Sequence, residues 1–314
     1  MTKLTRAEAA EFLARRDHIA ILTHGRPDGD TLGSAAALCR GLRSLGKTAH
    51  VLHNPEADTR FPGLLEGLTK KAAEDGDCLV SVDVASPGML PDCFKQYLGR
   101  IDLRIDHHGS ATSFTEYELV DPLSAACAEI VYDILCARGV RLDEQMGKAL
   151  YIAVSTDTGC FRYANTTAHS YRVAAACADT GADLHPITQA LFDTNSLSKL
   201  HLQSWIVHNA EFLAEGRAAI CVIPLELENS VSKDDMETIS GFLRSIEGIK
   251  MSAIVRSTDT GSKMSVRAIP GYDAATVCAR FGGGGHKGAA GASLDAPPTE
   301  AAQLLKPLLI TAVS

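Results

Sequence analysis

The first half of the chain alternates short apolar runs with longer amphipathic ones, and this alternation restricts the fold more than any other feature of the sequence. The short runs have the length of buried strands; they are residues 18–24, 48–53, 77–83 and 99–106. The longer runs have helical character; they are residues 32–46, 124–138, 143–155 and 166–180. Strands that alternate with helices predict an α/β fold, with a mainly parallel sheet and helices on both faces.

The pattern changes after the stretch 181–195. The elements expected from there on are a helix at 196–214, strands at 218–224, 251–257 and 263–269, a helix at 273–281 and a final helix from about 298. We expect a second, smaller α+β domain, because 314 residues are too many for one small core. The boundary is expected within 182–196, and the predicted domains are 1–188 and 196–314.

The composition limits the kinds of molecule that the chain can bind and the compartment in which it works. The formal net charge is −8 and no run of Lys or Arg is present, which argues against long nucleic acid but leaves room for a short anionic ligand. No stretch approaches the roughly 18 apolar residues of a membrane helix, and residues 1–16 lack the apolar core of a secretion signal. Nine cysteines without a CxxC pair predict free thiols in the reducing cytoplasm.

Acidic and imidazole side chains gather where the predicted strands end. They are His24, Asp28 and Asp30 after the first strand, Asp83 after the third, Asp106, His107 and His108 after the fourth, and Asp157 after the helix at 143–155. Ligands of an open parallel sheet bind beyond the carboxyl ends of its strands, so we expect these side chains at one rim. A lone Asp at a strand end is usually a turn or cap residue, so the hypothesis depends on their convergence.

The segment THGRPDGD allows two local geometries. His24 and Asp28 have the i, i+4 spacing of a metal-binding helix, but the glycines and the proline around them favour a loop. In an extended loop, Asp28 and Asp30 would face the same way.

Carboxylates gathered at one rim repel one another unless cations neutralise them. Two imidazoles with four carboxylates favour Mn²⁺ or a similar divalent ion, and six ligands suit two ions with a bridging carboxylate. The six expected ligands are His24, Asp28, Asp30, Asp83, His107 and Asp157. Two ions about 3.5–4 Å apart form a clamp for in-line displacement at phosphorus.

The triplet Asp106–His107–His108 cannot aim three adjacent side chains at one point. We expect only His107 to bind metal directly. Asp106 can then orient a neighbouring ring, and His108 is left to face the substrate as a hydrogen-bond donor or proton carrier.

The stretch FGGGGHKGAAGA at 281–292 is the main compositional extreme of the second half. A flexible linker is the simplest alternative, but the stretch lies between a predicted helix and a predicted strand. Glycine amides can approach an anion closely, and His286 and Lys287 add side-chain donors. Arg267, in the preceding strand KMSVRAI, offers a planar fork for phosphate or base.

Five segments together resemble the DHH phosphoesterase family with its C-terminal DHH-associated domain. They are THGRPDGDTLGSAAAL (23–38), VDVASPG (82–88), IDHHGS (105–110), STDTGCFRYANTT (155–167) and SVRAIPGYDAATVCARFGGGGHKGAAGA (265–292). They stand in the order of the family and span nearly the whole chain.

The resemblance implies two Mn²⁺ ions in the first domain, for which Mg²⁺ or Co²⁺ can substitute, and an active site in the cleft between the domains. The implied ligands are His24 and Asp28 for one ion, Asp30, His107 and Asp157 for the other, and Asp83 between them. The implied catalytic residues are Asp83, Asp106 and His108. The implied substrate contacts are Arg267, Gly283, Gly284, Gly285, His286 and Lys287 in the second domain, and Arg162 and Asn165 after the fourth motif.

A chain of this size without further domains resembles the oligoribonuclease and pAp-phosphatase subgroup (nanoRNases). This implies manganese-dependent hydrolysis of very short RNA to mononucleotides, from dinucleotides such as pGpG and pApA to about pentamers. It also implies hydrolysis of adenosine 3′,5′-bisphosphate (pAp) to AMP. The expected protein is a cytoplasmic monomer or homodimer that binds these substrates and neither long nucleic acid nor membrane.

Three alternatives stay open. A cyclic-dinucleotide phosphodiesterase usually carries membrane or sensor segments, and none is visible. A family II-like inorganic pyrophosphatase shares the metal motifs but needs no nucleotide-contacting platform such as the glycine-rich turn. A non-catalytic nucleotide sensor would have an incomplete ligand set, whereas all six ligands are present.

Overall fold

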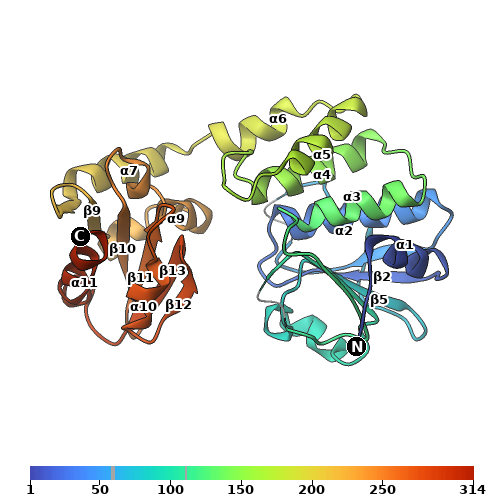
Figure 1. The fold of residues 1–314 in the computed structure, drawn as a ribbon, viewed down its shortest axis with the longest axis horizontal. Coiled ribbons are helices and arrows are strands. Elements are labelled where there is room, and N and C mark those ends of the chain that lie inside the picture. Colours follow the sequence, from blue (N-terminus) through green and yellow to red (C-terminus); the bar gives the residue numbers. More distant parts are fainter. Residues whose placement is uncertain (58–60, 110–111) are drawn as a thin grey trace. The chain divides into compact units, whose positions relative to one another are not determined.

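The computed structural model divides the chain into two compact units. The described residues are 1–57, 61–109 and 112–314. Ser110, the last residue of the motif IDHHGS, lies outside them. The units are Met1–Thr194 and Asn195–Ser314 (Figure 1). The sequence places the domain boundary in the range 182–196, which includes this division.

The first unit is built on a seven-stranded sheet whose described pairings are all parallel. Its strands are β1 Thr2–Lys3, β2 Ile19–Leu22, β3 Ala49–Leu52, β4 Thr69–Lys70, β5 Cys78–Val82, β6 Leu103–Asp106 and β7 Tyr117–Val120. Their order across the sheet is β1-β7-β6-β5-β2-β3-β4. Strands β2, β3, β5 and β6 are buried along their whole length, as expected for parallel strands covered on both faces. The predicted α/β fold is confirmed.

Helices cover one face of this sheet in two layers (Figure 1). Their bounds are α1 Arg6–Ala14, α2 Gly29–Ser44, α3 Cys127–Ala137, α4 Glu144–Asp157, α5 Ala168–Asp179, α6 His185–Thr188 and the π-helical η3 Gln189–Asp193. Helices α2 and α3 pack on the strands, and α1 lies beside α3. Helix α4 packs against α2 and α3, and α5 packs against α4 and α3. The 3₁₀ helices η1 (Pro87–Met89) and η2 (Asp92–Tyr97) cover the opposite face through Leu90, Phe94 and Tyr97.

Two glycines bring α4 close to α2. A Cβ atom on Gly29 would lie 2.5 Å from Oγ1 of Thr156, and one on Gly33 would lie 2.3 Å from the carbonyl oxygen of Ala149. Only glycine leaves this space. The C-terminal end of α4 therefore lies directly beside the first turn of α2.

The second unit is an α+β domain with a six-stranded sheet of order β12-β13-β11-β10-β9-β8. Its strands are β8 Glu211–Leu213, β9 Ala218–Val222, β10 Met251–Thr258, β11 Gly261–Ala268, β12 Gly284–His286 and β13 Ala289–Leu294. Strands β9 and β10 are parallel, and the other pairs are antiparallel. Its helices are α7 Leu197–Asn209, α8 Leu225–Glu228, α9 Lys233–Ile239, η4 Leu243–Ser245, α10 Ala274–Ala279 and α11 Pro298–Val313. Helices α10 and α11 cover one face, and α7 and α9 cover the other.

Several short elements are not visible in the sequence pattern. The helix predicted at 196–214 ends at Asn209, and the edge strand β8 follows it. Strands β1, β4 and β7 also escape prediction. The edge strands β1 and β4 have two residues each and no buried residue, and β7 has only two buried residues, so all three carry little hydrophobic signal. Within the described part of the chain, none of the helices combines the length and apolar character that membrane crossing requires.

Candidate active site

Three neighbouring strands place the first of the predicted site residues. Strands β6, β5 and β2 lie side by side, and the strand order switches direction between β2 and β5. Such a switch point opens a crevice at the carboxyl ends of the strands. His24 lies two residues after β2, Asp83 directly follows β5, and Asp106 is the last residue of β6. The expected rim therefore lies at this switch point.

Helix α2 begins directly after Asp28, which corrects the expectation that Asp28 and Asp30 face the same way in an extended loop. Asp28 caps α2, and its Oδ1 accepts hydrogen bonds from the N–H groups of Asp30 and Thr31, each at 3.1 Å. The buried carboxylate of Asp30 instead caps α3. It accepts from the N–H groups of Cys127 and Ala128 at 2.6 and 3.0 Å. The two carboxylates are thus fixed by different helix ends.

The six predicted metal ligands form two groups. The first is His24, Asp28 and Asp83, and the second is Asp30, His107 and Asp157. Within each group, one ligand atom per residue lies within 4.8 Å of the others. Asp83 joins them, because its Oδ2 lies 3.5 Å from Nε2 of His24 and its Oδ1 lies 3.5 Å from Nε2 of His107. A third group of this kind combines Asp83, His107 and His108.

The Asp83 carboxylate is suited to hold a cation. Its side chain is only 3% exposed, and Oδ1 has no hydrogen-bond partner among the described residues. An unsatisfied buried carboxylate oxygen is unfavourable, and a divalent ion would satisfy it. The Asp83 backbone has a left-handed φ of 59°, while its N–H still donates to the carbonyl of Ile105 at 2.9 Å. Such a conformation in a non-glycine residue is typical of functional sites.

Backbone carbonyls orient both histidines of the two groups. Nδ1 of His24 lies 2.7 Å from the carbonyl oxygen of Gly25, and Nδ1 of His107 lies 3.3 Å from that of Ser124. A carbonyl oxygen can only accept, so Nδ1 of each ring carries the proton. When neutral, each ring therefore presents the lone pair of Nε2 to the carboxylates. This donor set fits manganese or a similar divalent ion.

His108 is held differently. Its Nδ1 donates to Oδ1 of Asp106 at 2.8 Å, and the same oxygen accepts from the N–H groups of His107 and His108. The His108 side chain is 33% exposed. Asp106 thus fixes the His108 ring through Nδ1 and leaves Nε2 for a bound molecule.

Without a cation, the carboxylates keep both ligand imidazoles protonated. Burial lowers the pKa of His24, but Asp28 and Asp83 outweigh it and raise that pKa to about 10. Burial likewise opposes protonation of His107, and Asp157 and Asp83 raise its pKa to about 12. The metal-free cluster therefore holds a proton in each group where an ion would bind.

We expect Mn²⁺ binding to release protons from His24 and His107. Both raised pKa values lie above pH 7, so each ion must displace one imidazole proton. The apparent affinity of the protein for each ion should therefore rise about tenfold per pH unit between pH 6 and 8. In the metal-free fold, the same protonated rings contribute stability below pH 6.5 that is lost as pH rises through about 10 and 12. Calorimetric titration in two buffers of different ionisation enthalpy measures the release. Binding without proton release would contradict this account.

Arg267 and His286 lie in one row of the second sheet. Arg267 of β11 is opposite Ala289 of β13, which is opposite His286 of β12, so the three side chains share a face. Nη2 of Arg267 donates to Oγ of Ser240 at 2.8 Å. Burial and the nearby charge of Arg244 lower the pKa of Arg267. An anion bound beside Arg267 would counteract both effects.

The glycine-rich turn lines a concavity of about 460 Å³ together with Lys263 of β11. The fold itself requires two of the glycines. A Cβ atom on Gly283 would lie 2.2 Å from the carbonyl oxygen of Gly291, and Gly285 has a φ of 141°. Gly284 is different, because a Cβ atom there would meet no described atom within 4 Å and its φ is ordinary. Packing therefore does not explain the glycine at this position.

The other predicted substrate contacts lie on loops. Nε of Arg162 donates to the carbonyl of Gly159 at 2.6 Å, and its guanidinium carbon lies 5.7 Å from the ring centre of Phe192. Lys287 is exposed. The amide nitrogen of Asn165 donates to two backbone carbonyls.

The sequence pattern does not reveal some residues that orient the predicted ligands. Asn54 donates through Nδ2 to the carbonyl of His24 at 2.9 Å. Ser124 supplies the carbonyl that faces His107. Both are far along the chain from the ligands that they orient and belong to no local motif. Only the tertiary structure identifies them.

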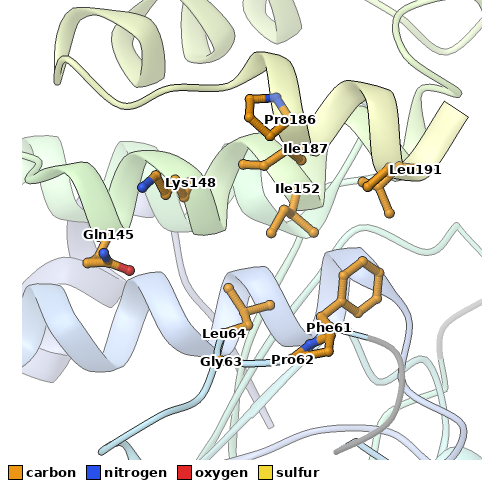
Figure 2. A pocket seen from close by; sticks show the side chains of 11 residues that line it. Phe61, Pro62, Gly63, Leu64, Gln145, Lys148, Ile152, Pro186, Ile187 and Leu191 are labelled. Atoms are coloured by element: carbon orange, nitrogen blue, oxygen red, sulfur yellow. The ribbon is translucent and has the colours of Figure 1, made fainter. Parts of the chain in front are cut away.

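The first unit also contains a concavity, which is mainly apolar (Figure 2). It has a volume of about 400 Å³ and is lined mainly by apolar side chains of residues 61–64, α4 and residues 186–191. Figure 2 shows Ile152 of α4 pointing toward Leu64 and Phe61. Its described lining contains none of the predicted site residues and neither carboxylate nor imidazole. This pocket therefore lacks groups for metal-assisted phosphate chemistry.

Family comparisons cover both units. A model described as the DHH family, N-terminal domain, matches residues 18–154, and a model of the DHHA1 domain matches residues 216–310. The chain is 33% identical over 278 residues to the bifunctional oligoribonuclease and PAP phosphatase NrnA of Thermus thermophilus. That match covers 88% of this chain and 84% of the relative.

Solved structures show the same fold. An exopolyphosphatase-related protein from Bacteroides fragilis matches with a TM-score of 0.82 at 23% identity, and the match covers 97% of both chains. The exonuclease RecJ bound to manganese matches with a TM-score of 0.52 at 16% identity, over 100% of this chain and 94% of that one.

Proposed function

This chain belongs to the DHH family, and we propose that it is a manganese-dependent phosphoesterase that hydrolyses very short RNA to mononucleotides and pAp to AMP. Family membership makes it a hydrolase acting on phosphoric esters. The observation that carries the metal-dependent chemistry is the pair of ligand groups joined by Asp83. The name of the relative from Thermus thermophilus supports the two substrate classes.

Two ions fit the ligand groups. One would lie on the group of His24, Asp28 and Asp83 and the other on the group of Asp30, His107 and Asp157, with Asp83 shared. We propose Mn²⁺ for both, with Mg²⁺ or Co²⁺ as substitutes; the manganese-bound RecJ structure supports this choice. When bound, the ions supply Lewis-acid polarisation of the phosphoryl group and activation of water.

His108 is proposed as the residue that contacts the reacting phosphate. The hydrogen bond that Nδ1 of His108 donates to Asp106 raises the pKa of His108 and so favours the protonated ring. With Nδ1 held by Asp106, Nε2–H is free to donate to a phosphoryl oxygen and stabilise the negative charge that develops there. Asp106 acts by fixing the ring and its proton.

The second unit is proposed to recognise the nucleotide. Arg267 and His286 share one face of its sheet, and Gly284, the first residue of β12, lines the concavity of the glycine-rich stretch. This combination offers charged donors and a backbone that a phosphate can approach closely. The first unit carries every proposed metal ligand, so recognition and chemistry are assigned to different units.

Gly284→Ala tests the role of the turn. We expect kcat/KM for short RNA to fall about tenfold to a hundredfold, the value of one or two charge-assisted contacts to phosphate. Hydrolysis of bis-p-nitrophenyl phosphate should change little, because this ester offers no nucleotide to recognise. Thermal stability should stay the same or rise slightly, since the added Cβ meets open space.

The matched control is Gly241→Ala, since Gly241 has equally open space in the same unit but lies outside the turn. An equal loss on both substrates in Gly284→Ala would argue against a recognition role for the turn.

We further propose the cytoplasm as the compartment of this enzyme. All nine cysteines, each in the described part of the chain, are free thiols. Reducing conditions maintain this state.

Hydrolysis of pApA, pAp, cyclic di-AMP and pyrophosphate by chelator-treated protein tests the proposed function. We expect pApA and pAp to be hydrolysed after addition of Mn²⁺ and not before, and the other two substrates to react far more slowly. Parallel assays with Mg²⁺ and Co²⁺ establish the range of metals. Preferred hydrolysis of pyrophosphate or of cyclic di-AMP would replace the nucleotide assignment by that activity. Nucleotide binding without turnover would indicate a sensor.

A further inference from the structure

The segment after α4 follows an unusual path. Gly159, Cys160 and Phe161 all have left-handed backbones, with φ values of 57°, 57° and 61°. This conformation is unfavourable for the two non-glycine residues, so neighbouring contacts must maintain it. The turn reverses the chain directly after Asp157, a ligand of the second metal group.

Packing and hydrogen bonds hold this turn in place. The Phe161 ring stacks on Tyr171 with a centroid distance of 5.3 Å and lies 6.2 Å from Tyr151. Oγ1 of Thr158 accepts from the N–H of Phe161, and the carbonyl of Thr158 accepts from the N–H of Arg162. The chain that follows is therefore fixed when it reaches Asn165.

Asn165, at the end of the turn, bonds back to Asp157, which directly precedes the turn. Its Nδ2 donates to the carbonyl oxygen of Asp157 at 3.0 Å and to that of Ala125 at 3.1 Å. One side-chain amide thus connects the end of α4 to the loop before α3. Both hydrogen bonds are made to backbone, so no other side chain is needed for the connection.

The loop before α3 orients the other two ligands of the same group. The carbonyl of Ser124 faces Nδ1 of His107 at 3.3 Å. Two residues after Ala125, the N–H of Cys127 donates to Asp30 at 2.6 Å. Asn165 therefore contacts the backbone that positions every ligand of the group Asp30–His107–Asp157.

We propose that Asn165 is a positioning residue that sets the metal affinity of the group Asp30–His107–Asp157. It acts through the carbonyls of Asp157 and Ala125, which differs from the direct substrate contact that the family resemblance implies. Among the described residues, Asn165 makes no hydrogen bond to the group His24–Asp28–Asp83, where Asn54 holds the carbonyl of His24 instead. The affinity of that group should therefore not depend on Asn165. The inference rests on the proposed function only in that both groups bind divalent ions.

Calorimetric titration of chelator-treated protein with Mn²⁺, in the absence of substrate, tests this proposal. Wild type should bind two ions. Asn165→Ala and Asn165→Leu should bind one of them about 10–100-fold more weakly, the usual cost of losing a group that orients a metal ligand, and the other unchanged. Asn165 is exposed, so both variants are expected to fold.

The matched control is Asn209→Ala, because Nδ2 of Asn209 also donates to a backbone carbonyl, that of Trp205 at 2.8 Å, but in the second unit. It should bind both ions as wild type does. Unchanged Mn²⁺ affinity with a raised KM would assign Asn165 to substrate contact, and unchanged affinity with a lower Tm of the metal-free protein would assign it to the fold alone. Either result overturns the proposal. A wild type that binds no ion would instead contradict the proposed function.

Discussion

Replacing Asp83 by Asn is expected to lower phosphodiester hydrolysis by about a thousandfold or more, a loss of roughly 4 kcal/mol of transition-state stabilisation. The two oxygens of Asp83 face Nε2 of His24 and Nε2 of His107, one in each ligand group. An amide presents one oxygen and no charge, so it cannot serve both groups. Asn is chosen because Asp83 has a left-handed backbone, which Asn adopts more readily than Ala.

The metal-free fold should survive this substitution with little change in stability. The charge of Asp83 raises the pKa values of His24 and His107, which is a favourable interaction with the protonated rings. The same charge also raises the pKa values of Asp30 and Asp157, for which burial is the larger cause, and this interaction is unfavourable when they ionise. Removing the charge of Asp83 therefore loses its attraction to the two protonated histidines and relieves its repulsion of Asp30 and Asp157.

Turnover assays and thermal unfolding of the metal-free protein, on the same preparations, measure both parts of this prediction. The matched control is Asp102→Asn. Asp102 precedes β6 at the opposite end of the sheet, and its Oδ2 accepts from the N–H of Leu79 at 2.8 Å, a bond that an amide oxygen can keep. Asp102→Asn should retain full activity. Near-normal turnover by folded Asp83→Asn would rule out a catalytic pair of ions bridged by Asp83.

The convergence of the ligands was predictable because it follows from chain direction alone. All strands of the first sheet are parallel, so residues that follow different strands reach the same edge. Asp83 and His107 could therefore be placed together without knowledge of distances. Sequence alone does not show that the strand order switches between β2 and β5, which puts His24 and Asp83 on the two sides of one crevice.

What the sequence could not show is how the ligands are fixed. Asp30 was predicted as a ligand, but its role as the cap of α3 depends on the packing of two helices that are distant in the chain. The left-handed turn after Asp157 likewise depends on aromatic packing around Phe161. In the second unit, the row formed by Arg267 and His286 depends on strand register. Local patterns identify reactive groups, and tertiary contacts determine their orientation.

The adjacent histidines should respond differently to substitution. His107→Ala is expected to weaken Mn²⁺ binding strongly, because Nε2 of His107 faces the carboxylates of its group, at 3.2 Å from Asp157. His108→Ala should leave Mn²⁺ affinity nearly unchanged and lower turnover by about 10²–10⁴, the usual contribution of a positioned proton donor or acceptor. The physical reason is that Nδ1 of His108 is held by Asp106 at 2.8 Å, so the ring is oriented by a residue outside the two proposed ligand groups.

Calorimetric Mn²⁺ titration and kcat measurements at saturating Mn²⁺ on both variants decide between the two roles. At saturating Mn²⁺, His107→Ala should regain part of its activity, whereas His108→Ala should not, since the group it lacks is the proposed hydrogen-bond donor to the substrate. His208→Ala serves as control, because His208 is exposed in the second unit and its Nδ1 bonds only within α7, to the carbonyl of Ser204. Equal loss of Mn²⁺ affinity in the two variants would mean that His108 is a ligand of the third group, with Asp83 and His107, and that the phosphate-facing donor must be sought elsewhere.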